Sequence, residues 1–147
     1  MITRTLRSHA LFLLRYGWPV LALLAILWFP FDWLSTVWPS FGAVFRQVFR
    51  SDHDHFVGHT IFFLIVGVLI LAYVPQLRHK LHWYLIGLVL AALMQETIQA
   101  LFGGRMLSFT DMNAFKGDAL GGISAFILWR ITLVFQHYRR TRTGPAA

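Results

Sequence analysis

The sequence predicts an all-α integral membrane protein, a bundle of four transmembrane helices with a short interfacial helix between the first two. Hydrophobic residues make up 57% of the 147-residue chain and charged residues only 13%, about half the charged share of a typical soluble domain. The mean hydropathy is +0.60, and several apolar stretches approach the roughly 20 residues with which a helix spans a bilayer. We expect residues 1–147 to form one domain.

The first expected span covers residues 16–34, YGWPVLALLAILWFPFDWL. Pro19 suits a first helical turn, whereas Pro30 would kink or end the helix. A cleaved signal peptide is the competing interpretation, but no small-residue cleavage site follows the apolar run. We therefore expect this segment to remain as a membrane anchor.

A short interfacial helix is expected over residues 41–50. Apolar residues recur there at steps of three and four, and Arg46 and Arg50 lie off that stripe. This pattern is typical of an amphipathic helix that lies in the plane of the membrane surface. The stripe consists of Phe41, Val44, Phe45, Val48 and Phe49.

Three further spans are expected over residues 57–74, 83–102 and 115–135, each a long apolar stretch. Within the last of these, Gly121 and Ala125 are four residues apart. Such a spacing of small residues lets two membrane helices approach closely.

The stretch SDHDH at residues 51–55 has two interpretations. Ser51 or Asp52 can cap the helix that follows, and Asp54 is favourable near its positive end. The alternative is a metal site that uses Asp52, His53, Asp54, His55 and His59. We favour the cap, because four consecutive residues do not share one helix face.

The basic residues indicate the orientation, because cytoplasmic loops carry an excess of lysine and arginine. The two ends and the loop between the second and third spans hold nine of them, and the other side holds four. We therefore expect both termini in the cytoplasm and the acidic residues toward the outer face. The nine are Arg4, Arg7, Arg15, Arg78, Lys80, Arg130, Arg139, Arg140 and Arg142; the four are Arg46, Arg50, Arg105 and Lys116.

The net charge of +7 would suggest nucleic-acid binding in a soluble domain. In a membrane protein it indicates loops that face anionic lipid headgroups, so we expect no nucleic-acid partner. The chain has no cysteine, which excludes disulfides and thiolate ligands. We expect no metal and no other cofactor.

Polar residues gather at the outer end of the expected bundle. Glu96 and Gln99 are three residues apart and share a helix face. A carboxylate within a span costs roughly 2.5–3.5 kcal/mol, so it is functional or paired. Arg105 is the expected partner of Glu96, either in a functional site or in a buried ion pair that fixes helix packing.

The remaining polar candidates lie on the outer loop and at the neighbouring helix ends. Asp111 is expected on the loop or on a short helix capped by Ser108 or Thr110. Asp118 is expected in the first turn of the fourth span, and His59 opens the second. The expected topology places six polar side chains at the same depth, near the outer end of the bundle: His59, Glu96, Gln99, Arg105, Asp111 and Asp118.

Over about residues 54–125 the chain resembles the VanZ-like family of bacterial membrane proteins. That family has an aspartate before a helix-opening histidine, then Glu-x-x-Gln, then arginine, serine and aspartate, and finally Asn-x-x-Gly. Two positions depart from it: Asp54 precedes His59 by five residues where four is usual, and Asp118 stands where asparagine is expected, a role that Asn113 could fill. The matching positions are His59, Phe63, Gly67, Glu96, Gln99, Arg105, Ser108 and Asp111.

The resemblance implies a multi-pass protein of the bacterial cytoplasmic membrane that lowers sensitivity to teicoplanin-type lipoglycopeptides. It implies no particular reaction. The expected partner is a membrane lipid or a lipid-linked envelope precursor, and the oligomeric state is left open.

Two functions remain open on these residues. In the first, an enzyme acts on such a lipid: Glu96 or His59 moves a proton, Arg105 holds a phosphate or carboxylate, and Asp111 orients a neighbour. In the second, a non-catalytic protein binds the lipid or the antibiotic, or serves as a structural partner. Apolar walls between the spans would take the acyl chains. Residues expected to contact the substrate are Gln99, Asp54, Ser108 and Asp118.

Overall fold

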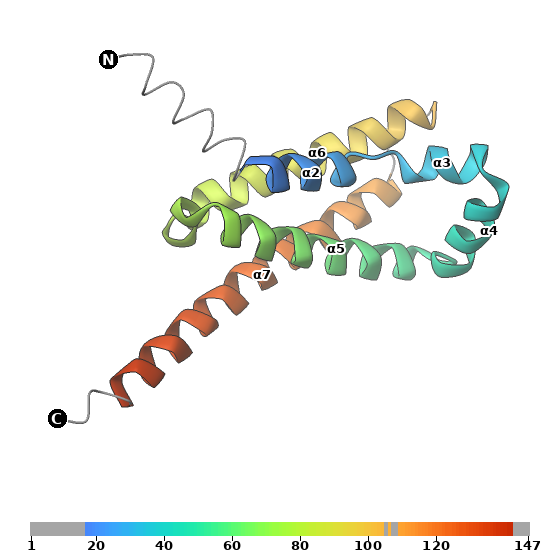
Figure 1. The fold of residues 1–147 in the computed structure, drawn as a ribbon. Helices are drawn as coiled ribbons and strands as arrows, with labels where there is room; N and C mark the ends of the chain where they lie inside the picture. Colours follow the sequence, from blue (N-terminus) through green and yellow to red (C-terminus); the bar gives the residue numbers. More distant parts are fainter. Residues whose placement is uncertain (1–16, 105, 107–108, 143–147) are drawn as a thin grey trace, which may run out of the picture.

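The computed structural model describes residues 17–104, 106 and 109–142, and this part of the chain is all-helical, with no strand (Figure 1). The predicted all-α class is confirmed. The elements in chain order are α2 (Trp18–Leu27), α3 (Phe31–Val37), α4 (Pro39–Val48), α5 (Asp52–Tyr73), the 3-10 helix η2 (Pro75–His79), α6 (Leu81–Phe102) and α7 (Phe109–Arg142).

Three helices among the described residues are long and apolar enough to cross a membrane, namely α5, α6 and α7. They correspond to the second, third and fourth predicted spans. Each begins earlier than predicted, and α7 also continues to Arg142. At 1.5 Å per residue α7 is roughly 50 Å long, and its C-terminal part projects away from the other helices (Figure 1).

The segment predicted as the first span, residues 16–34, is interrupted near Pro30, where the sequence predicts a kink or an end: α2 ends at Leu27 and α3 begins at Phe31. The chain leaves the helical path at Trp28, and Pro30 precedes the first residue of α3. Proline has no backbone N–H and clashes with the preceding helical turn, which explains the break. With ten residues α2 is roughly 15 Å long, so it does not cross a bilayer of about 30 Å by itself.

Two short helices, α3 and α4, lie at the end of the bundle where α5 begins (Figure 1). The short helix predicted over residues 41–50 is confirmed as α4, although it covers residues 39–48. Its aromatic stripe is continuous: the ring centroids of Phe41 and Phe45 are 5.7 Å apart, and those of Phe45 and Phe49 are 4.8 Å apart.

A reciprocal capping box begins α5. The Ser51 hydroxyl accepts a hydrogen bond from the Asp54 backbone N–H (3.2 Å), and the Asp54 carboxylate accepts one from the Ser51 backbone N–H (3.0 Å). These bonds satisfy two donors that a helix start otherwise leaves unpaired. The predicted cap at Ser51 is therefore confirmed.

Small residues on α7 bring its backbone against that of α5. A Cβ atom added to Gly117 would lie 2.7 Å from the Phe56 carbonyl oxygen, and one added to Gly121 would overlap the carbonyl oxygen of Thr60. Ala125, one turn further, is completely buried. The predicted close approach at Gly121 and Ala125 is confirmed, and Gly117 extends it by one turn.

The apolar core lies between α2, α5 and α6 and is closed on the other side by α7. At its centre the hydroxyl of Tyr84 on α6 donates a 2.9 Å hydrogen bond to the Gly122 carbonyl oxygen on α7. This bond satisfies both buried polar groups and links two of the long helices. The core residues are Leu27, Phe63, Val66, Leu71, Tyr84, Leu88, Ala91 and Ala92.

We expect Gly121→Ala to destabilise the fold, because the new methyl group would overlap the backbone of α5. Overpacking of this kind costs about 1–3 kcal/mol. Gly87→Ala is the matched control, since nothing lies within 4 Å of a Cβ atom at that position. Thermal unfolding of both variants in detergent would test this. Equal melting temperatures would show that the α5–α7 approach does not limit stability.

Candidate functional site

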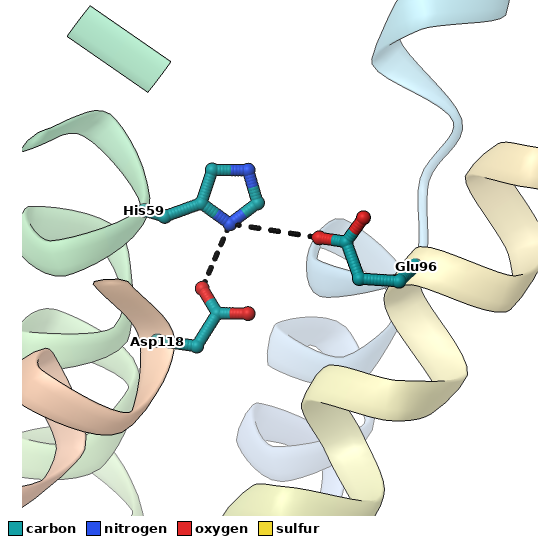
Figure 2. A group of neighbouring side chains, drawn as sticks. All are labelled: His59, Glu96 and Asp118. Carbon is teal, nitrogen blue, oxygen red and sulfur yellow. Dashed lines mark hydrogen bonds and ion pairs between the residues drawn. The ribbon is translucent and has the colours of Figure 1, made fainter. Parts of the chain in front are cut away.

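Three ionisable side chains from three helices meet in the interior: His59 on α5, Glu96 on α6 and Asp118 on α7 (Figure 2). The Nδ1 atom of His59 lies 2.7 Å from Oδ1 of Asp118 and 3.8 Å from Oε1 of Glu96. The same imidazole nitrogen therefore faces both carboxyl groups.

The three residues share one level because of their depth along antiparallel helices. His59 lies seven residues after the start of α5, Glu96 six before the end of α6, and Asp118 nine after the start of α7. At 1.5 Å per residue each lies roughly 9–14 Å from the same end of the bundle. The cluster is thus within the three candidate spans, below the end covered by α3 and α4.

Both carboxyl groups are buried and incompletely paired. Glu96 is 4% exposed and Asp118 is 1% exposed. Among the described residues, Oε1 of Glu96 and Oδ2 of Asp118 have no hydrogen-bond partner. Buried polar atoms without partners are rare and unfavourable. This cluster is therefore suited to taking up a proton, a cation or a polar ligand.

The hydrogen bond to Asp118 indicates which nitrogen of His59 carries the hydrogen. A carboxylate can only accept, so Nδ1–H donates to Asp118 in the neutral imidazole. The other nitrogen, Nε2, points away from Asp118 (Figure 2) and then has a free lone pair. A carboxylate that fixes this tautomer is how proteins prepare a histidine to accept a proton at Nε2.

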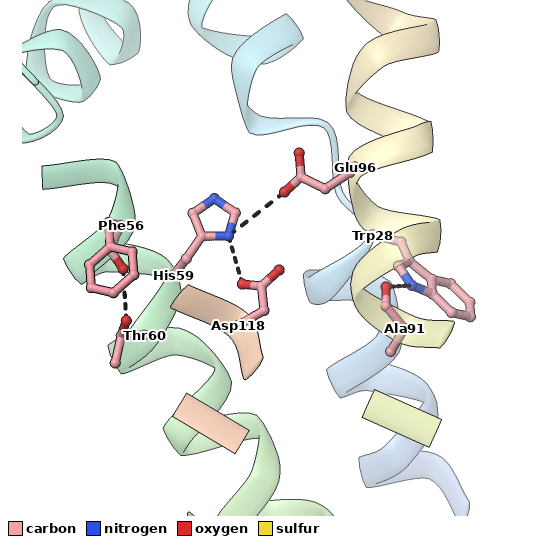
Figure 3. Close-up of polar contacts among 7 residues, drawn as sticks. All are labelled: Trp28, Phe56, His59, Thr60, Ala91, Glu96 and Asp118. Carbon is pink, nitrogen blue, oxygen red and sulfur yellow. Dashed lines mark hydrogen bonds and ion pairs between the residues drawn. The ribbon is translucent and has the colours of Figure 1, made fainter. Parts of the chain in front are cut away.

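Two further hydrogen bonds lie near the cluster (Figure 3). The Trp28 indole N–H donates a 3.3 Å hydrogen bond to the carbonyl oxygen of Ala91, which ties the end of α2 to α6. Thr60, next to His59, donates its hydroxyl to the Phe56 carbonyl oxygen at 2.9 Å. Because that hydroxyl is satisfied within α5, it does not compete for Asp118.

Two cavities meet at His59. A polar cavity of about 590 Å³ lies toward the helix ends and includes Glu96 in its wall. An apolar cavity of about 520 Å³ runs between α4 and α5 and takes in the whole aromatic stripe of α4. Residues common to both walls are Asp32, Phe45, Phe49, His55, His59 and Gln99.

The polar cavity is acidic. Carboxyl groups from four elements line it, whereas Arg46 is the one arginine or lysine in its wall among the described residues. Asp111 and Glu96 are also close enough to interact directly. The excess of negative charge favours cationic groups in this cavity. The carboxylates are Asp32, Asp52, Glu96 and Asp111.

The structure brings most of the predicted site residues together. His59, Glu96, Gln99 and Asp111 line the polar cavity, and Asp118 contacts His59. Of the two predicted placements of Asp111, loop or helix, the structure shows the helical one, in the first turn of α7. The placement of Asp118 differs from the prediction: because α7 begins at Phe109, Asp118 lies two turns after Asp111 on the same face rather than in the first turn.

Of the predicted site residues that the structure describes, Asp54 is not brought to the site. The carboxylate of Asp54 is committed to the capping box and lines neither cavity. Arg105 and Ser108 lie outside the described residues, as does the side chain of Thr110. The predicted Glu96–Arg105 pair and the predicted cap at Ser108 or Thr110 therefore fall outside the described part of the chain.

The metal alternative for residues 51–55 is not supported in the described chain. His55 stacks on Phe49 with ring centroids 5.0 Å apart. The potential metal ligands that do come together in the described chain are His59, Glu96 and Asp118, from three different helices. Their donor atoms all lie within 4.8 Å of one another. The sequence prediction had recognised these residues as polar candidates but not as a ligand set.

Two residues of the site were missed from the sequence. Gln95 is buried, lines the apolar cavity, and its Oε1 has no hydrogen-bond partner among the described residues. Asp32 lines both cavities from α3, which packs against α4 and α6. Two signals in the sequence could have indicated these residues. Gln95 is a polar residue next to Glu96 in an apolar span, and Asp32 is an acidic residue two positions after Pro30.

Searches against family models, curated proteins and solved structures found no match to this chain. Its chemistry is accordingly inferred from its own residues.

We expect Asp118→Ala to destabilise the protein, because the His59 Nδ1–H would lose its buried acceptor. The loss of such a partner costs about 1–3 kcal/mol. Asp118→Asn retains a carbonyl acceptor of nearly the same size and should lose less. Chemical unfolding in detergent would compare the two variants. An alanine variant as stable as the asparagine variant would show that this hydrogen bond does not stabilise the fold.

Proposed function

We propose that this chain is a VanZ-like protein of the bacterial cytoplasmic membrane that takes an envelope lipid, or a lipid-linked precursor, into its two cavities. The headgroup would occupy the polar cavity and the apolar chain the neighbouring one. The observation that carries the proposal is the meeting of these cavities at His59. An amphiphile has the same division into polar and apolar parts, which few soluble metabolites share.

The walls of the apolar cavity support entry from the side of the membrane. The stripe of α4 forms one wall, and Ile61, Phe62 and Ile65 of α5 form the other. Ile61 is 53% exposed and Ile65 is 52% exposed. Exposed apolar residues on a candidate span face lipid rather than water. An acyl chain could therefore pass from the bilayer into the cavity without crossing a polar surface.

The His59–Asp118 pair supports proton transfer at the headgroup. With Nδ1–H held by Asp118, Nε2 can accept a proton from a headgroup hydroxyl or from water. Glu96, beside the same imidazole, would stabilise the positive charge that then develops on the ring.

Binding without covalent chemistry is the second candidate function, and the hydroxyl groups of the polar cavity favour it. Ser35 and Thr36 line this cavity, but their hydroxyls donate to the carbonyl oxygens of Asp32 and Trp33, each at 2.7 Å. Among the described residues no hydroxyl is hydrogen-bonded to His59 as an activated nucleophile would be. A serine or threonine nucleophile is therefore the less favoured mechanism on the described chain.

We further propose four spans with both termini in the cytoplasm, so that the polar cluster faces outward. The excess of basic residues on the opposite side supports this orientation. Leu27 of α2 is buried in the core shared with α5 and α6, which supports a first span that includes α2.

Expression in a teicoplanin-sensitive Gram-positive host tests the proposal. We expect the wild type to raise the inhibitory concentration of teicoplanin several-fold. Glu96→Gln should abolish this protection, because it removes the charge at the centre of the site. His53→Gln is the matched control, since His53 is exposed on α5 and lines neither cavity.

Membrane levels of all three proteins would be matched by immunoblot and their melting temperatures compared in detergent. Failure of the wild type to protect would overturn the proposed role. Protection that declines only in proportion to protein level would assign Glu96 to helix packing instead.

A further inference from the structure

We propose that His59, Glu96 and Asp118 bind a divalent transition-metal ion of the Zn²⁺ class, with an open position toward the polar cavity. Each residue offers one donor atom, and these atoms lie within 4.8 Å of one another. The two carboxyl groups are more than nine-tenths buried, and each has an oxygen without a hydrogen-bond partner in the described chain. A cation bound between these donors would satisfy Oε1 of Glu96, the oxygen that faces Nδ1 of His59.

The donor set suits such an ion. Zn²⁺ binds imidazole nitrogen and carboxylate oxygen, whereas Mg²⁺ and Ca²⁺ prefer oxygen alone. Structural zinc sites usually have four protein ligands, and sites that bind a further molecule have three. The three ligands here leave a position for water or a headgroup oxygen. His59 would bind through Nδ1, since that nitrogen faces both carboxyl groups.

The observed distances are close to those of a metal site. Ligand atoms about 2.1 Å from a tetrahedral ion lie about 3.4 Å from one another. The His59–Asp118 distance of 2.7 Å is shorter than this, and the His59–Glu96 distance of 3.8 Å is longer. The first distance would have to lengthen by about 0.7 Å and the second to shorten by about 0.4 Å, and the three donor atoms all lie within 4.8 Å of one another. Side-chain rotation can supply movements of this size. The ion would take the place of the hydrogen that His59 now donates to Asp118.

Charge balance supports the same conclusion. Two carboxylates, a neutral imidazole and a divalent cation sum to zero, which suits a cluster buried within candidate membrane spans. Asp32 and Asp111 in the wall of the polar cavity add to the negative potential. The positive charge in that wall among the described residues is Arg46, together with any protonated His55 or His59. A cation is therefore attracted to this end of the bundle.

The ion would also explain how an acidic cavity could accept an anionic headgroup. Four carboxylates repel a phosphate, whereas a divalent cation with an open position binds a phosphate oxygen directly. This step rests on the proposed function, but the metal site itself does not.

Metal binding to the full chain tests the inference. The protein purified in detergent would be stripped with a chelator, dialysed against Zn²⁺ and analysed for bound metal by mass spectrometry. We expect one Zn²⁺ per chain and a rise in melting temperature on binding. Co²⁺ in place of Zn²⁺ should give the visible absorption of a four-coordinate site.

Two ligand variants and one control complete the test. Glu96→Gln and Asp118→Asn should each weaken Zn²⁺ binding by more than the roughly 10–100-fold that outer-shell partners contribute. His53→Gln should bind like the wild type. Absence of both bound Zn²⁺ and a thermal shift in the wild type would overturn the inference, whether or not the variants fold. Unchanged affinity in a folded ligand variant would do the same.

Retention of anionic phospholipid, measured by native mass spectrometry on zinc-free and zinc-loaded protein, separates this inference from the proposed function. Lipid retained by a protein that binds no Zn²⁺ would overturn the metal site and leave the lipid function standing. Zn²⁺ bound without lipid retention would support the metal site and contradict the lipid function.

Discussion

The close approach of α5 and α7 is the constraint on which the rest of the structure depends. Glycine at positions 117 and 121 removes the side chains that would otherwise separate the two backbones. Without an apolar solvent-driven force between helices in lipid, such close packing is a main source of attraction. His59 lies at this contact: a Cβ atom added to Gly117 would be 3.2 Å from the Cβ atom of His59. The imidazole can therefore reach Asp118, one residue further along α7.

The cluster also shows how the fold tolerates buried charge. Isolated carboxylates within a span are unfavourable, yet Glu96 and Asp118 are both nearly inaccessible. Their common contact is one imidazole nitrogen, which forms a good hydrogen bond to Asp118 and only a longer contact to Glu96. Packing between the helices holds the groups together although their polar atoms are not all satisfied. Such an imbalance is more typical of a site that binds something than of a structural ion pair.

The sequence alone was sufficient to predict the helices whose composition is uniform along their length. The second and third spans are continuous apolar runs, and the stripe of α4 follows helical periodicity, so their class and approximate bounds were predictable. The depth of His59 and Glu96 from the helix ends also predicted their convergence. The start of α7 was missed because residues 109–114 are mixed in polarity and resemble a loop. That error moved Asp118 to a first turn and hid its pairing with His59, since pairing depends on the face of the helix as well as on depth.

His59 links the two chemistries that the cluster can support, and it cannot serve both in the same way. When Nδ1 donates to Asp118, Nε2 is the free base and the carboxylates only orient and stabilise the ring. When Nδ1 binds a cation, the hydrogen moves to Nε2, and the imidazole can donate but no longer accept. The same three side chains would then act through the positive charge of the ion rather than through proton transfer by histidine. Occupancy of Nδ1 therefore decides whether the headgroup meets a base or a Lewis acid, and both arrangements use the polar cavity beside Glu96.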